Sequence, residues 1–76
     1  MACETRLRYK CKKGVKLNHH QIAFTAGDTV EFLKQDNYII HLKGIKGFCK
    51  DEKIEVNTDE FLDSCEFDYS VSVVIK

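Results

Sequence analysis

The chain has 76 residues, 43% of them hydrophobic and 32% charged, and its formal net charge is zero. This length predicts a single domain over residues 1–76, and the composition argues against a disordered chain. No stretch approaches the ~20 apolar residues of a membrane span, and the N-terminus lacks the apolar core of a secretory signal, so we expect a cytoplasmic location and no membrane partner.

The first predicted strand covers residues 6–12, where polar and apolar side chains alternate strictly. A period of two places every second side chain on the same face of a strand, and the apolar set here is Leu7, Tyr9 and Cys11. We expect that face to be buried. Residues 15–21 follow as a loop or a short irregular strand.

A β-meander is predicted for residues 22–48, and the rest of the chain is organised around it. Gly27 and Asp28 are turn-forming residues, and Gly44 marks a later turn. Alternating, β-branched and aromatic residues identify the strands. The expected short strands are residues 29–33, 38–42, 45–49 and 54–56, with a hairpin connection at residues 35–37.

The C-terminal part is predicted to form a short helical turn near residues 58–64 and then a final strand at residues 66–76. Thr58 is expected to cap the helix, because its hydroxyl can accept a hydrogen bond from a free backbone N–H group. The acidic residues that follow suit the positive end of the helix dipole. We expect Phe61 and Leu62 to face the barrel.

The first and last strands are expected to pair antiparallel, which would hide two sheet edges. Their charges would then face each other, and opposite charges at facing positions contribute about 0.2–1 kcal/mol each. The residues concerned are Arg6, Arg8 and Lys10 on the first strand and Glu66 and Asp68 on the last. Alternation predicts one apolar face of the last strand, made of Phe67, Tyr69, Val71, Val73 and Ile75.

This order of strands and turns resembles an SH3-like barrel over residues 9–67. The residues that carry the resemblance are Phe24, Gly27, Asp28, Val30, Tyr38, Gly47 and Phe48. It implies a mostly β fold, a partly open SH3-like barrel of five or six antiparallel strands. The tyrosine pair and the prolines of that family are absent, and Tyr38 stands where it usually has tryptophan, so binding of proline-rich peptides does not carry over. The expected core residues are Leu7, Tyr9, Phe24, Val30, Phe32, Tyr38, Ile40, Leu42, Phe48, Val56, Phe61, Leu62, Phe67, Tyr69 and Val71.

Cysteine and histidine residues are the main candidates for catalysis or metal binding. The spacings of structural zinc sites are absent among Cys3, Cys11, Cys49, Cys65, His19, His20 and His41. We expect no metal, no cofactor and free thiols, with a disulfide framework as the alternative to free thiols. Cys49 and His41 form a conceivable nucleophile and base, but no phosphate-binding loop is present and a small barrel has little room for a substrate, so we expect no enzymatic activity.

Charge is distributed unevenly along the chain. Residues 1–50 carry ten Lys or Arg against four Asp or Glu, a net of +6, and residues 51–76 carry two against eight, a net of −6. A run of carboxylates can dock on a basic partner or mimic the phosphates of a nucleic acid. This predicts a non-catalytic module that binds another protein, such as a small inhibitor or accessory subunit of the phage or mobile-element type. The predicted contact residues are Asp51, Glu52, Glu55, Asp59, Glu60 and Asp63, with exposed apolar neighbours such as Ile39 and Val74. The alternative is a solvated surface that only keeps the protein soluble.

A second function hypothesis rests on the basic N-terminal strand. Cations spaced along one face of a strand can follow phosphates, and an exposed aromatic ring can stack on a base. This hypothesis predicts a small β-barrel that binds nucleic acid through Arg6, Arg8, Lys10, Lys12, Tyr38 and Lys46. Against it, the domain is not basic overall, and the acidic C-terminal strand can neutralise the basic strand.

Overall fold

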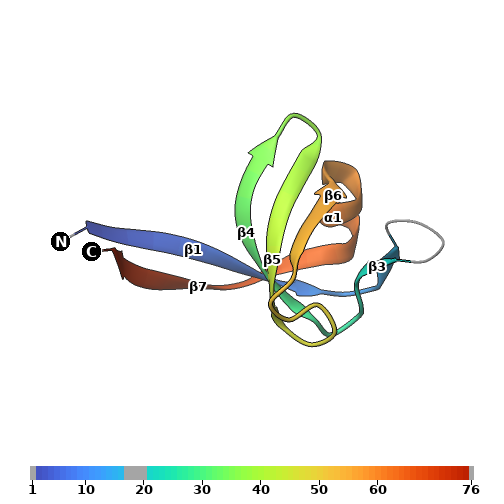
Figure 1. Cartoon of the computed structure of the whole chain (residues 1–76), viewed down its shortest axis with the longest axis horizontal. Helices are drawn as coiled ribbons and strands as arrows, with labels where there is room; N and C mark the ends of the chain where they lie inside the picture. Colours follow the sequence, from blue (N-terminus) through green and yellow to red (C-terminus); the bar gives the residue numbers. More distant parts are fainter. Residues whose placement is uncertain (1, 17–20, 76) are drawn as a thin grey trace.

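The computed structural model describes residues 2–16 and 21–75. Its fold is mostly β with one short helix, which confirms the predicted fold class (Figure 1). The elements in chain order are β1 (Ala2–Cys11), β2 (Val15–Lys16), β3 (Ile22–Phe24), β4 (Thr29–Asp36), β5 (Ile39–Lys46), β6 (Lys53–Asn57), α1 (Thr58–Ser64) and β7 (Cys65–Ile75).

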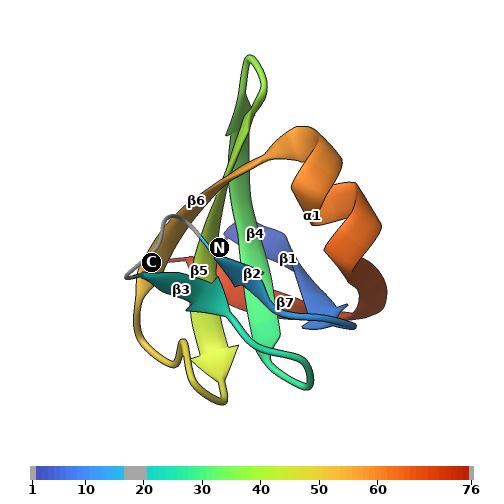
Figure 2. The ribbon, with the colours of Figure 1, turned by 90° about the vertical axis from the view of Figure 1, so that its right-hand side faces the viewer.

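Five of these strands form one antiparallel sheet in the order β6-β5-β4-β1-β7, and β2 and β3 form a separate small sheet. The large sheet curls into a barrel, but its outer strands β6 and β7 do not pair with each other within the described residues (Figure 2). The barrel is therefore partly open, and β6 and β7 each keep one free edge.

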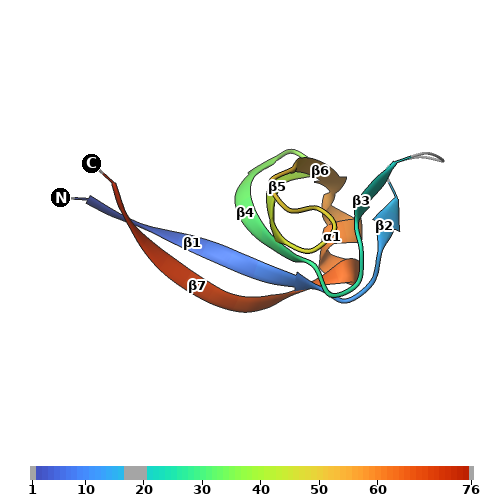
Figure 3. The same cartoon turned by 60° about the horizontal axis from the view of Figure 1, so that its bottom comes forward.

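A two-stranded arm extends from this barrel. β1 pairs with β4 only at residues 8–10, whereas it pairs with β7 along its whole length. Residues 2–7 of β1 and 70–75 of β7, which we call the arm, therefore leave the barrel together, and the paired residues Ala2 and Ile75 lie at its tip (Figures 1 and 3). The arm accounts for the elongated shape of the molecule, which measures 45 × 26 × 19 Å.

The predicted antiparallel pairing of the first and last strands is confirmed, but its predicted charge pairs are mostly wrong. Lys10 does lie opposite Glu66. A β-bulge then places Asp68 outside the register, because two residues of β7 are added where β1 advances by one. Arg6 and Arg8 consequently lie opposite apolar residues of β7 and find their carboxylate on β4 instead.

The same bulge divides the predicted apolar face of the last strand between two faces. Phe67 lies opposite Tyr9, and the two rings meet edge to face with centroids 5.8 Å apart. Tyr69 lies opposite Arg8, the neighbour of Tyr9 on β1, and so points to the other side of the sheet. The alternate residues Tyr69, Val71, Val73 and Ile75 therefore lie on the opposite face of the sheet from Phe67.

The core lies inside the barrel, between the curled sheet, β3 and α1. Predicted core residues that are buried are Phe24, Val30, Ile40, Leu42, Val56 and Phe61, and those only partly buried are Leu7, Tyr9, Phe32 and Val71. The core prediction is wrong for five exposed residues, Tyr38, Phe48, Leu62, Phe67 and Tyr69. The core instead contains smaller residues, namely Cys11, Val15, Ala23, Cys49, Ile54 and Cys65.

The third strand of the meander differs from the prediction. Residues 45–49 do not form a separate strand, because β5 continues to Lys46 and the chain then turns through residues 47–51. Gly47 and Asp51 adopt positive φ angles of 92° and 67°, which are compatible with a turn and incompatible with a strand. β6 is the third strand. The hairpin between β4 and β5 turns at Asn37, whose φ is 57°.

The predicted helix forms at the expected place, but with a different cap and orientation. Asn57 is the N-cap, and its side-chain oxygen accepts a 2.9 Å hydrogen bond from the backbone N–H of Asp59, a role predicted for Thr58. Phe61 faces the barrel and is 3% exposed, as predicted. Leu62 follows at about 100° around the helix and is 66% exposed, so its predicted burial is wrong.

Candidate protein-docking site

The six carboxylates predicted to contact a partner lie in the turn before β6, on β6 and on α1. β6 and α1 follow each other at one edge of the barrel (Figure 2). All six are exposed. Glu55 lies on β6, and the others lie in the turn before β6 or on α1. We call this set the acidic edge: Asp51, Glu52, Glu55, Asp59, Glu60 and Asp63.

Only two members of the acidic edge face a basic side chain within the described residues. Asp63 accepts a hydrogen bond from Lys13, and this bond and the lysine charge hold the pKa of the Asp63 carboxyl below its ordinary value. Glu55 Oε1 lies 3.3 Å from Nδ1 of His41, a contact that becomes an ion pair when the imidazole is protonated. In the same part of the chain, no ion-pair partner is found for Asp51, Glu52, Asp59 and Glu60.

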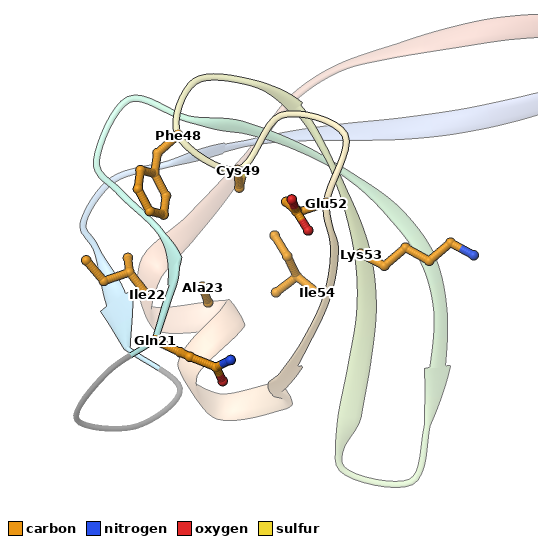
Figure 4. A pocket seen from close by; sticks show the side chains of 8 residues that line it. All are labelled: Gln21, Ile22, Ala23, Phe48, Cys49, Glu52, Lys53 and Ile54. Atoms are coloured by element: carbon orange, nitrogen blue, oxygen red, sulfur yellow. The ribbon is translucent and has the colours of Figure 1, made fainter.

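A groove of about 410 Å³ lies beside the acidic edge, where the barrel is open between β3 and β6. Figure 4 shows the Phe48 ring above Ile22 on one side and Ile54 pointing in from β6. Phe48 is 62% exposed and Ile22 43% exposed. We call this cavity the β3–β6 groove. The residues that line it are Gln21, Ile22, Ala23, Phe48, Cys49, Glu52, Lys53 and Ile54.

This groove was not predicted from the sequence, because Phe48 was expected in the core. The available signal was the charged run at residues 50–53, which follows closely after Phe48 and is typical of an exposed turn. Of the exposed apolar neighbours that were predicted, Ile39 lies opposite Asn57 of β6, close to the start of α1. Val74 lies in the arm, far from β6 and α1 (Figure 1).

The buried carboxylate of Asp28 holds the turn that carries Phe48. It accepts hydrogen bonds from the backbone N–H of Thr25 at 2.9 Å, the Thr25 hydroxyl at 3.0 Å and the backbone N–H of Phe48 at 3.1 Å. Burial of Asp28 opposes ionisation, but these bonds outweigh burial and keep the pKa of its carboxyl below the ordinary value. Gly47 packs so closely that an added Cβ would lie 2.1 Å from Asp28 Oδ1. Phe48 is therefore presented by a rigid turn.

The basic residues of β1 are engaged by a second buried carboxylate, Glu31 on β4. Glu31 is only 2% exposed. Its Oε1 accepts a 2.8 Å hydrogen bond from Arg8 Nε, and its Oε2 accepts one of 3.2 Å from Arg6 Nη1. Alternation along residues 29–33 predicts Glu31 on the solvent face, but the two arginine side chains cover it. Arg6 and Arg8 therefore serve the fold of this barrel.

Glu31→Gln is expected to destabilise the fold by about 1–3 kcal/mol, because charge-assisted bonds to Arg6 and Arg8 are lost inside a covered site. Urea denaturation followed by circular dichroism measures the change in the free energy of unfolding. Glu4→Gln is the matched control, since Glu4 also contacts Arg6, at 3.4 Å, but is half exposed. We expect the control to change stability by less than about 0.5 kcal/mol. Equal effects of the two changes would contradict the role given to Glu31.

The residues predicted to bind nucleic acid are not brought together. Tyr38 is 78% exposed at the turn between β4 and β5, while Lys46 ends β5 at its opposite end, about 24 Å away along the strand. Lys10 faces Glu66, and Lys12 follows the end of β1. With Arg6 and Arg8 on Glu31, the set does not form one continuous basic surface.

Two thiols of the core, those of Cys11 and Cys49, are held in the protonated form by their surroundings. Cys11 and Cys65 face each other with Sγ atoms 3.8 Å apart, and their hydrogen bond, with burial, raises the pKa of the Cys11 thiol. Burial and the neighbouring Asp28 carboxylate raise the pKa of Cys49 to about 12. His41 faces Glu55 on the neighbouring strand, whereas Cys49 faces Asp28, so the conceivable Cys49–His41 pair is not supported by its surroundings.

In residues 2–16 and 21–75, no cluster of three or more His, Cys, Asp or Glu side chains could hold a metal ion. His19 and His20, which the metal hypothesis also considered, lie outside the described residues. No helix in the described part of the chain has the length and apolarity to cross a membrane. Comparison with protein families, with curated proteins and with solved structures gives no match.

Proposed function

We propose that this chain is a non-catalytic protein-binding module whose docking surface combines the β3–β6 groove with the acidic edge. The observation that carries the proposal is the exposure of Phe48 and Ile22 at a groove of mixed apolar and polar lining, beside carboxylates that lack ion-pair partners among the described residues. Exposed aromatic residues next to charged groups are typical of protein interfaces.

The free edge of β6 suits an extended segment of the partner. β6 pairs with β5 on one side only, and β3 lies on the other side of the groove in a separate sheet. An extended peptide could add to this edge through its backbone, with alternate side chains entering the groove beside Ile54. Phe48 would pack against an apolar side chain of such a segment.

The charge of the surface selects for a basic partner. Glu52 and Lys53 both line the groove, and the other acidic residues, which lie in the turn before β6, on β6 and on α1, make the surrounding charge negative. Rim charges of this kind chiefly accelerate association, and their effect falls with salt. We therefore propose a partner segment that alternates basic and apolar residues.

The narrower predictions, an inhibitor or accessory subunit of the phage or mobile-element type, belong to this proposal. The cytoplasmic location is also part of this proposal, because free thiols such as that of buried Cys49 are usual in the cytoplasm. The nucleic-acid alternative has less support, because Arg6 and Arg8 are engaged by Glu31.

A display library of random peptides tests the docking surface directly, because selection from such a library requires no identified partner. Peptides selected on the wild-type chain are expected to combine Lys or Arg with apolar residues. Phe48→Ala combined with Glu52→Lys is expected to weaken their binding about tenfold or more, since truncated interface aromatics commonly cost this much. Fluorescence anisotropy measures the affinities.

The matched control is Phe67→Ala combined with Asp68→Lys, which removes an exposed aromatic and reverses an exposed acid on β7, at the other edge of the sheet. We expect this control to bind the selected peptides as the wild type does. Selected peptides without basic residues, or equal losses in both double variants, would contradict the proposed surface.

A further inference from the structure

The arm is built from two strands that have little support besides each other. Among the described residues, β1 has no strand pairing to β4 N-terminal to residue 8, so apart from the Arg6–Glu31 contact residues 2–7 and 70–75 form a two-stranded ribbon on their own. Such a ribbon is marginally stable in water on its own, and three or more strands are normally needed. Yet both strands remain regular along the whole arm.

The free edge of β7 is protected in the barrel and unprotected in the arm. Proteins shield sheet edges with charges, prolines and bulges. Within β7, the charges of Glu66 and Asp68 and the bulge all fall in its first part. Residues 69–75 carry no charge, no proline and no bulge, although Tyr69, Val74 and Ile75 are 40%, 53% and 44% exposed. An edge left open in this way is a surface for pairing with another strand.

The odd-numbered residues of this edge are apolar on both sides of Ser72. If two copies of β7 pair antiparallel about Ser72, Val71 meets Val73 of the second copy, and Tyr69 meets Ile75 of the second copy. All four of these side chains lie on one face of the arm, opposite the face of Ser72. Every apolar residue of that row therefore gains an apolar neighbour, as a two-fold interface requires.

Charge also permits this pairing. The chain has no net charge, so two copies do not repel each other at long range. On β1, Arg6 lies beside Val71 and Glu4 beside Val73. Each of the two rows in which Val71 of one copy meets Val73 of the other would then carry Arg6 of one copy and Glu4 of the other, which are opposite charges.

We propose that the arm is a docking surface for a second copy of this chain, which pairs β7 with β7 antiparallel about Ser72 to form a four-stranded ribbon. The paired segment of seven residues is about 24 Å long. Such a contact lies toward the small end of specific interfaces, which bury about 1,200–2,000 Å² in total. We therefore expect a dissociation constant in the micromolar range.

Disulfide trapping tests the register. Ser72→Cys in a Cys3→Ser background places two thiols opposite each other across the two-fold axis, at a Cα separation of about 5 Å that a disulfide spans. Thr5→Cys in the same background is the matched control, because Thr5 faces Ser72 from β1 and would lie about 14 Å from its own copy across the four strands. With oxidised glutathione, the covalent dimer is expected to form at least about tenfold faster for Ser72→Cys, since only that pair meets disulfide geometry. Equal rates would overturn the proposal.

Sedimentation velocity tests the association itself. At hundreds of micromolar, the wild type is expected to shift from a mass of 8.8 kDa to twice that value. Ser72→Lys should weaken self-association about fivefold or more, because it sets like charges directly opposite each other, whereas Thr5→Lys adds the same charge one strand away and should change it less than about twofold. Both positions are exposed, so the monomer fold is preserved. A monomeric wild type, or equal effects of the two lysines, would overturn the proposal.

Discussion

Replacing Gly44 with alanine is expected to abolish cooperative folding of this chain. A Cβ atom at Gly44 would lie 1.6 Å from the carbonyl oxygen of Cys49 and 2.4 Å from its carbonyl carbon. The turn cannot retreat cheaply, because the Gly44 N–H donates to the Glu52 oxygen at 2.8 Å and the Asp51 N–H donates to the Gly44 oxygen at 2.9 Å. We expect a loss above about 4 kcal/mol. The stability of a chain of this length is about 4–11 kcal/mol in total.

Two other glycines give a graded control series for this prediction. Gly27 has a φ of 94° but no atom within 4 Å of an added Cβ, so Gly27→Ala should cost only the backbone strain of about 1–2 kcal/mol. A Cβ at Gly14 would make an ordinary 3.4 Å contact, so Gly14→Ala should cost less than about 1 kcal/mol. Urea denaturation followed by circular dichroism measures all three. A Gly44→Ala protein within about 1 kcal/mol of Gly27→Ala would contradict the close approach of the backbone.

Local patterns were sufficient to predict the helix and most of the strands, but not the strand predicted at residues 45–49, which is a turn after β5. Alternation along residues 6–12 and 66–76 depends on neighbours in the sequence, and both segments form strands that pair antiparallel. The helix at Thr58–Ser64 follows from its acidic first turn and polar cap, although Asn57 rather than Thr58 supplies the cap. These features do not depend on what lies across the sheet.

Apart from the antiparallel pairing of the first and last strands, features that depend on distant partners were not predicted. The bulge at Asp68 is a property of the pairing between β1 and β7, so alternation along β7 alone misplaces Tyr69 on the face of Phe67. The burial of Glu31 depends on arginines 23 and 25 residues earlier in the chain. The β3–β6 groove likewise forms between strands of two different sheets, an arrangement that no short window of sequence specifies.

The candidate site was predicted in part for the same reason. Its acidic edge could be read from a run of carboxylates, and the structure places all six at exposed positions on consecutive elements. Its apolar component was not predicted, because Phe48 was assigned to the core of a strand at residues 45–49, whereas the turn after β5 exposes it. Asp28, 20 residues away, fixes that turn. The apolar part of the proposed docking surface thus depends on one buried carboxylate.

Asp28→Asn is therefore expected to destabilise the fold by about 3 kcal/mol at neutral pH, because an amide cannot accept all the hydrogen bonds that Thr25 and Phe48 donate to the carboxylate. Thr25→Val is the control. It removes only the hydroxyl bond to Asp28 and leaves both backbone bonds, so it should cost about 1 kcal/mol. Urea denaturation measures both, and a loss no larger for Asp28→Asn than for Thr25→Val would contradict the role of the carboxylate.

The pH dependence of this difference follows from the lowered pKa of Asp28. In the unfolded chain an aspartate titrates near pH 3.9. Above that pH the carboxylate is ionised in both states and its stabilisation is fully present. As the pH falls below about 4 toward the lower pKa of the folded state, the unfolded chain takes up the proton first and this stabilisation is lost. The stability difference between the wild type and Asp28→Asn should therefore be constant from pH 7 to about pH 5 and shrink below about pH 4, because asparagine does not titrate. A difference that stays constant or grows on acidification would show that the ionised form of Asp28 does not hold the turn.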